Sequence, residues 1–316
     1  MDSAGITQSG SLYFTTPNTM VDIYVIGIDQ GTGKIVTPQK KMIIPKQWKN
    51  YEPQYSPDGK FLAYIRMSPT GSLERSLCVF SLETRQERHF PLAVEARFPR
   101  WSPDNRFVYF SAFLSGSGMR MYRLDRQTGK YGVLLPDNAV DPANGNQFIS
   151  CSSDGKSYYF TYWEGNTRTC QILVRNAEGI THKLFEAKDG YSWEAAVSPD
   201  GSRLVAVSRA VHREITILPT SGNGPSKVLY QFDQEGEHPA WLVWTPDGKS
   251  IIFTKRNNDR EWGLWRISAE GGEPQNLGIS TQWISGISIH PDGKQLAFSS
   301  VVPGTSSKEL WVLDNF

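Results

Sequence analysis

A short polar corner, Pro-Asp-Gly in its most complete form, recurs six times along the chain and is followed each time by an apolar and aromatic run. The spacing between the successive aspartates is 46, 50, 46, 47 and 45 residues. A period of roughly 40 to 50 residues with several short strands per unit is typical of β-propeller blades. The six copies are SPDGKFLAYI (56–65), SPDNRFVYFS (102–111), SSDGKSYYFT (152–161), SPDGSRLVAV (198–207), TPDGKSIIFT (245–254) and HPDGKQLAFS (290–299).

The chemistry of this corner indicates a tight turn between two antiparallel strands. Proline sets φ at the start of the turn, the aspartate carboxylate accepts hydrogen bonds from nearby backbone N–H groups, and glycine supplies a position with φ > 0. A catalytic carboxylate would not need to occur six times at one geometric corner. The sequence therefore predicts a structural role for Asp58, Asp104, Asp154, Asp200, Asp247 and Asp292.

A seventh, weaker copy lies upstream in GITQSGSLYFTT (5–16), where Gly10 precedes Gly59 by 49 residues. Seven copies predict one all-β domain over residues 1–316, a seven-bladed propeller of four-stranded antiparallel blades. The alternative is a six-bladed ring in which the N-terminal segment only completes the last blade. Residues 5–45 hold material for three strands, more than one closing strand needs, so seven blades are favoured. The expected blades are 5–46, 47–93, 94–140, 141–188, 189–234, 235–280 and 281–316.

Composition and charge exclude several classes of function. Lys plus Arg total 33 and Asp plus Glu 32, so a net charge of +1 gives no overall attraction to nucleic acid or anionic membranes. Three cysteines suggest neither a disulfide framework nor a zinc site. Residues 1–20 lack the features of a signal peptide, and no apolar run is long enough to insert in a bilayer. A soluble protein is expected, and the sequence fits equally a domain of a longer one.

Known catalytic motifs do not occur in the sequence. A G-x-S-x-G nucleophile elbow and an H-E-x-x-H metal motif are both missing, and the two GKS tripeptides belong to the repeated corners. Of five histidines, only His212 and His238 are expected on one face. The sequence therefore predicts no catalytic residue, no bound metal and no cofactor.

Propeller geometry nevertheless points to a binding face. The loops that lead into the innermost strands and those that join the second and third strands open around one mouth of the central channel. These loops are rich in Arg and Trp, which combine forked hydrogen bonding with flat apolar area. Tyr51, Glu52 and Arg75 belong to the same face, whereas Trp101 and Trp244 are expected to pack between blades. The predicted ligand-binding residues are Arg66, Arg97, Gln147, Trp163, Trp193, Glu194, Arg209, His238, Trp241, Arg256 and Trp283.

The S/T-P-D-G-K/R corner, followed by strands such as DIYV (22–25) and ELWV (309–312), resembles the TolB-type, WD-like propeller repeat. Similar repeats precede the hydrolase in prolyl oligopeptidase-like peptidases. The resemblance implies a docking surface, a gate before a protease, or a domain of a bacterial sensor or envelope protein, which would be periplasmic if the longer protein is exported or membrane-anchored. A minority of such propellers, the oligogalacturonate lyase-like members, are enzymes with a metal in the channel.

These observations lead to one functional prediction and one alternative. The prediction is a non-catalytic module that binds a protein or peptide partner, or an anionic ligand such as an acidic saccharide, at the channel mouth, without binding nucleic acid. The alternative is a channel-centred enzyme of the oligogalacturonate lyase-like type that acts on acidic saccharides.

Overall fold

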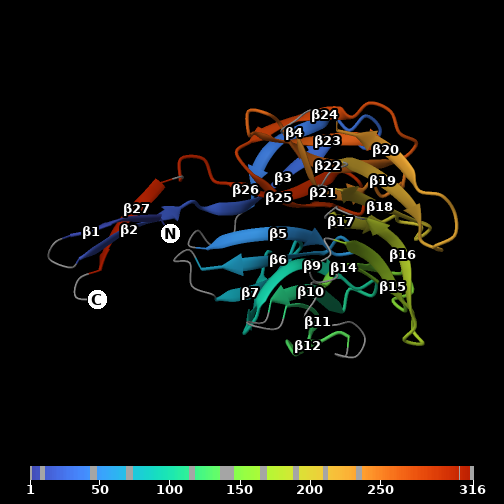
Figure 1. The fold of residues 1–316 in the computed structure, drawn as a ribbon, viewed down its shortest axis with the longest axis horizontal. Coiled ribbons are helices and arrows are strands. Elements are labelled where there is room, and N and C mark those ends of the chain that lie inside the picture. The colour runs from blue at the N-terminus through green and yellow to red at the C-terminus, as the bar shows by residue number, and fades with distance from the viewer. Residues whose placement is uncertain are drawn as a thin grey trace.

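The structure, a computed structural model, consists of β-strands arranged as a ring of six blades with a small extra sheet (Figure 1). None of the described residues forms a helix with the length and apolar character needed to cross a lipid bilayer. The residues that the structure describes are 2–7, 11–42, 48–68, 74–113, 118–135, 146–163, 169–187, 192–208, 213–232, 237–305 and 307–313.

Five blades are built from consecutive strands, each an antiparallel sheet whose first strand is innermost. Blade 1 is β5 (Lys49–Tyr55), β6 (Phe61–Met67), β7 (Arg75–Ser81) and β8 (Glu87–Leu92). Blade 2 is β9 (Glu95–Trp101), β10 (Phe107–Phe113), β11 (Met119–Asp125) and β12 (Tyr131–Val133). Blade 3 is β13 (Asn146–Cys151), β14 (Tyr158–Trp163), β15 (Cys170–Arg175) and β16 (Thr181–Ala187). Blade 4 is β17 (Ser192–Val197), β18 (Arg203–Ser208), β19 (Glu214–Pro219) and β20 (Lys227–Gln231). Blade 5 is β21 (His238–Trp244), β22 (Ser250–Arg256), β23 (Trp262–Ser268) and β24 (Gln275–Thr281).

Blade 6 closes the ring by combining strands from both ends of the chain. Its inner strands are β25 (Ile284–Ile289) and β26 (Gln295–Val301), and its outer strands are β3 (Val21–Ile28) and β4 (Ile35–Lys41). Strand β26 pairs with β3 over seven residues without a register shift. Ile23 and Ile26 of β3 are fully buried in this position. The prediction of seven blades is therefore wrong, and the six-bladed alternative is the observed fold.

The strands of the N-terminal segment, expected to form a blade of their own over residues 5–46, are divided between two places. Strands β3 and β4 complete blade 6, whereas β1 (Asp2–Ile6), β2 (Leu12–Asn18) and β27 (Ser307–Leu313) form a three-stranded sheet in the order β1-β2-β27. Figure 1 shows this sheet outside the ring. The third strand of the last repeat, β27, thus pairs with β2 because the free edge of β26 is already occupied by β3.

The repeated corners have the predicted chemistry. In blade 1, the Ser56 hydroxyl donates to Asp58 at 2.6 Å, and the Lys60 N–H donates to the same carboxylate at 3.0 Å. The equivalent bonds recur at the other five corners, except that His290 takes the place of the hydroxyl residue in the last. Gly59 has φ 69°, and Asn105 adopts φ 58° where blade 2 lacks glycine. The structural role of these aspartates is confirmed.

Between blades, apolar side chains of neighbouring sheets interdigitate. Trp101 and Trp244 are both buried, and each donates its indole N–H to a carbonyl of the preceding blade, at 2.9 Å to Gln54 and 3.0 Å to Ala196. These tryptophans therefore join blades, as expected from their places beside the corners.

The corner hydrogen bonds predict a loss of stability in acid. Bonds donated by Ser198 and Ser202 lower the pKa of Asp200 to about 2. Because this pKa lies below that of the unfolded chain, the stabilisation is complete above about pH 4 and declines as the pH falls toward 2. We expect the urea midpoint of the Asp200→Asn variant, which cannot titrate there, to fall less than that of the wild type between pH 5 and pH 2. Urea midpoints that fall by the same amount in the variant and the wild type would contradict this role of Asp200.

Candidate functional site

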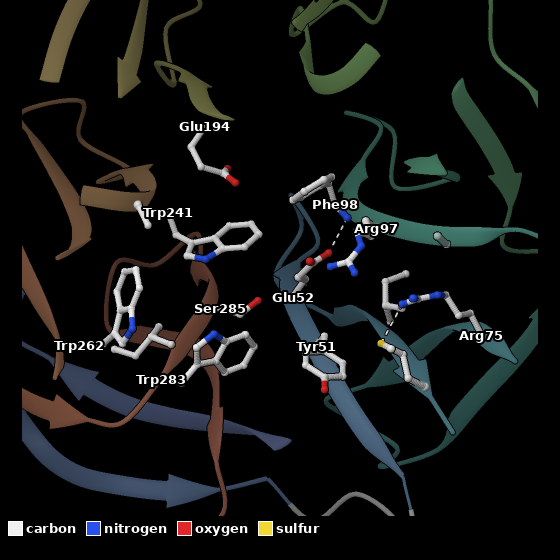
Figure 2. A pocket seen from close by; sticks show the side chains of 15 residues that line it. Tyr51, Glu52, Arg75, Arg97, Phe98, Glu194, Trp241, Trp262, Trp283 and Ser285 are labelled. Atoms are coloured by element: carbon white, nitrogen blue, oxygen red, sulfur yellow. Dashed lines mark hydrogen bonds between the residues drawn. The ribbon is translucent and has the colours of Figure 1, made fainter. Parts of the chain in front are cut away.

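A cavity of about 310 Å³ opens at one end of the central channel. Four innermost strands, β5, β9, β21 and β25, supply most of its wall (Figure 2). Its polar and aromatic lining residues are Tyr51, Glu52, Arg75, Arg97, Phe98, Glu194, Trp241, Trp262, Trp283 and Ser285.

One side of the cavity is aromatic. Figure 2 shows the indoles of Trp241, Trp262 and Trp283 gathered on the side formed by blades 5 and 6. The Trp283 ring meets Tyr51 edge to face, with the ring centroids 5.7 Å apart, and Trp241 meets Phe98 at 5.6 Å. Each indole is only partly buried, so this wall presents flat apolar area to a ligand.

The opposite side carries two arginines. Arg75 is 7% exposed; its guanidinium donates to the Met67 sulfur at 2.8 Å and contacts the Glu95 carboxylate at 3.4 Å. Burial, together with the charge of Arg97, lowers the pKa of Arg75. Arg97 is exposed, and its guanidinium makes no hydrogen bond or ion pair within the described part of the chain. Arg97 therefore presents exposed guanidinium N–H donors to a ligand, and its charge also acts on the nearby Glu52 carboxylate.

Two buried glutamates, Glu52 and Glu194, each 3% exposed, also line the cavity. Glu52 accepts the Phe98 N–H at 2.5 Å. Burial raises the pKa of Glu52, although this hydrogen bond and the nearby arginines oppose the shift. Glu194 lies 3.8 Å from Arg100, which also donates to the carbonyls of Pro99 and Ile149. Both carboxylates are thus engaged with their neighbours.

The predicted site residues fall into four groups. Arg97, Glu194, Trp241 and Trp283 line the cavity together. Five others do not line the cavity or are described only in part. Gln147 is buried on β13, and its Oε1 has no partner among the described residues, whereas His238 and Arg256 face each other across the β21–β22 pair. Trp163 and Trp193 lie on β14 and β17, and only their backbone is described. Arg209 lies outside the described residues.

Arg66 forms a separate group, because it belongs to a buried network between blades 1 and 6. It contacts the Glu87 carboxylate through two bonds of 2.7 Å, and its Nε donates to Asn50 at 3.2 Å. Asn50 in turn donates to Asp22 of β3 at 3.1 Å. Arg66 is absent from the cavity wall, which the neighbouring residues Ile65 and Met67 help to form.

Six of the ten polar and aromatic lining residues were not among the predicted ligand-binding residues, although three of them, Tyr51, Glu52 and Arg75, were expected on the same face; the other three are Phe98, Trp262 and Ser285. The register of the repeat contained a signal for two of them. Glu52, Phe98 and Trp241 each lie four residues before the first residue of a corner, so the choice of Trp241 points to the other two. Trp262 begins a third strand, a position that the analysis of loops did not consider.

Comparison with known proteins shows which fold this chain shares. No family model matches the sequence. A structure named as a candidate TolB from Agrobacterium tumefaciens superimposes with a TM-score of 0.66 at 17% identity, over 90% of this chain and 99% of that one. TolB from Acinetobacter baumannii gives a TM-score of 0.60 at 16% identity, over 91% and 65%. The chain has the TolB-like propeller fold.

Other proteins that share the TolB-like fold include enzymes. An oligogalacturonate lyase in complex with manganese gives a TM-score of 0.55 at 15% identity, over 89% of this chain and 77% of that one. By sequence, an uncharacterised protein of Agrobacterium fabrum is 22% identical over 78% of this chain, and the uncharacterised peptidase YuxL of Bacillus subtilis is 22% identical over 64%. The chain spans 64% and 29% of the lengths of these two relatives.

Within the ranges that the structure describes, no three His, Cys, Asp or Glu side chains come together as a possible metal-ion site.

Proposed function

We propose that this propeller is a non-catalytic binding module that holds a peptide segment of a protein partner in the channel-mouth cavity. The observation that carries the proposal is the arrangement of three indoles opposite the unpaired guanidinium of Arg97 in one cavity. Tryptophan and arginine dominate the energetics of protein interfaces, because they desolvate large areas and fix the orientation of the bound group. A volume of about 310 Å³ is enough for a few side chains, so the peptide would contribute one or two anchor residues.

A peptide array tests this proposal. Twelve-residue peptides of varied sequence would be probed with the wild type and with the double variant Trp241→Ala/Trp283→Ala. We expect the wild type to bind a subset that shares an aromatic residue beside an acidic one, and the double variant to lose about tenfold or more in affinity for it. Phe113→Ala, which removes an aromatic ring that is 43% exposed outside the cavity, is the matched control and should change affinity by less than about twofold.

Two further measurements keep the test decisive. If the double variant does not fold, Arg97→Ala replaces it, because this exposed side chain contributes little to folding. Binding that survives the loss of Arg97 and of the indoles would overturn the proposal, as would an array without bound peptides. Release of unsaturated products from oligogalacturonate in the presence of Mn²⁺ would instead favour the channel-centred enzyme.

A further inference from the structure

One kind of hydrogen bond between neighbouring blades occurs twice in the ring. The Phe148 N–H of blade 3 donates to the Ser111 hydroxyl of blade 2 at 2.9 Å. The Glu52 N–H of blade 1 donates to the Ser299 hydroxyl of blade 6 at 3.0 Å. In both bonds the donor lies four residues before its corner, and the hydroxyl residue lies seven residues after its corner aspartate. We call these places the amide position and the hydroxyl position.

Blade 1 has no hydroxyl at this place, because its hydroxyl position is Ile65. The N–H at the facing amide position, that of Phe98 in blade 2, donates instead to the Glu52 carboxylate. Phe98 is 8% exposed, and a buried N–H without an acceptor would be costly. The Glu52 carboxylate therefore supplies the hydrogen-bond acceptor between blades 1 and 2 that the Ile65 side chain lacks.

The same combination of residue types occurs across the ring, in blade 4. Its hydroxyl position is Val207, and Glu194 stands at its amide position, as Glu52 does in blade 1. The hydroxyl positions of blades 3 and 5 are Thr161 and Thr254, whose hydroxyls have no partner among the described residues. Glutamate thus occupies the amide position only in the two blades that lack Ser or Thr at the hydroxyl position. The amide positions of the other four blades are Phe98, Phe148, Trp241 and Gly286.

We infer that Glu52 and Glu194 are positioning residues that complete the contacts between blades, and that the ligand reaches the cavity with a carboxylate that pairs with Arg97. This inference rests on the proposed function and names the charge of the ligand. Both cavity carboxylates are engaged by the protein, Glu52 by the Phe98 N–H and Glu194 by Arg100. Glu52 also fixes the backbone next to Arg97, since Phe98 is held at φ 55°. The arginine therefore stays directed toward the ligand.

Matched substitutions separate this role from direct ligand binding. Glu52→Gln keeps an acceptor for the Phe98 N–H and removes the charge, Glu52→Ala removes both, and Glu52→Ala/Ile65→Ser restores a hydroxyl at the position used in blades 2 and 6. The probes are N-acetyl-L-tryptophan, which carries an indole and a carboxylate, and the neutral N-acetyl-L-tryptophanamide. Binding is measured by NMR titration and stability by thermal unfolding, both at pH 7.

We expect the wild type to bind the acid about tenfold more tightly than the amide. Glu52→Gln should keep this affinity within about threefold. It should also be at least as stable as the wild type, because it no longer buries a carboxylate, and burial raises the pKa of the Glu52 carboxyl. Glu52→Ala should bind more weakly and unfold at a lower temperature, and adding Ile65→Ser should recover both.

Three outcomes would overturn the inference: loss of binding in a folded Glu52→Gln variant, equal binding of the acid and the amide, or failure of Ile65→Ser to restore the stability of Glu52→Ala. Failure of the wild type to bind the acid at millimolar concentration would also overturn the assignment of ligand charge. Each of these leaves the proposed function standing if peptides on the array still require the indoles.

Discussion

Deletion of residues 1–41 is expected to abolish cooperative folding of the ring. This deletion removes β3 and β4, the outer half of blade 6, and leaves the edge of β26 unpaired. Ile23, Ile26 and Tyr24 of β3 are each at most 6% exposed, and fully burying such a side chain contributes about 1.5–3 kcal/mol. Together with the lost backbone pairing, these terms approach the whole stability of a typical domain, about 5–15 kcal/mol. Far-UV circular dichroism and urea unfolding measure the effect.

A shorter deletion provides the control. Removing residues 1–19 takes away β1 and β2 and leaves β3 and β4 in place. Within the described part of the chain, β1 and β2 pair with each other and with β27, outside the ring, so we expect cooperative unfolding to persist. Similar behaviour of the two deletions, whether both fold or both fail, would show that closure through β3 does not hold the ring together.

Replacement of Arg66 by methionine is expected to destabilise the protein by about 3 kcal/mol or more, because breaking one side of a buried ion pair leaves an uncompensated charge. The Arg66 side chain is 7% exposed and that of Glu87 18%. The Tyr64 hydroxyl also donates to Glu87, so the network would lose its central cation. The free energy of unfolding in urea, compared with that of the wild type at pH 7, measures the effect.

The double variant Arg66→Met/Glu87→Met tests whether the two side chains act together. We expect it to be less destabilised than the sum of its single variants, because neither charge is then left alone. The folded fraction of Arg66→Met should bind the peptides of the array as the wild type does, since this side chain is absent from the cavity wall. A change in unfolding free energy below about 1 kcal/mol would show that the network is not strongly stabilising.

Part of the candidate site could be predicted from the sequence and part could not. The repeat register places Arg97, Trp241 and Trp283 near one channel mouth, because every blade repeats the same course around the axis. The role of Glu52 could not be read in the same way. It depends on Ile65 in the neighbouring strand and on an N–H of the next blade, two partners that only the folded ring brings together.

The period of the repeat and the chemistry of its corners follow from the sequence alone, because a turn is decided by a few adjacent residues and their hydrogen bonds. The number of blades does not. Strands β3 and β27 have similar apolar patterns, DIYV and ELWV, and the backbone edge of β26 could pair with either. Only the tertiary structure decides between them, since one free edge accepts one strand and β3 buries its apolar side chains there.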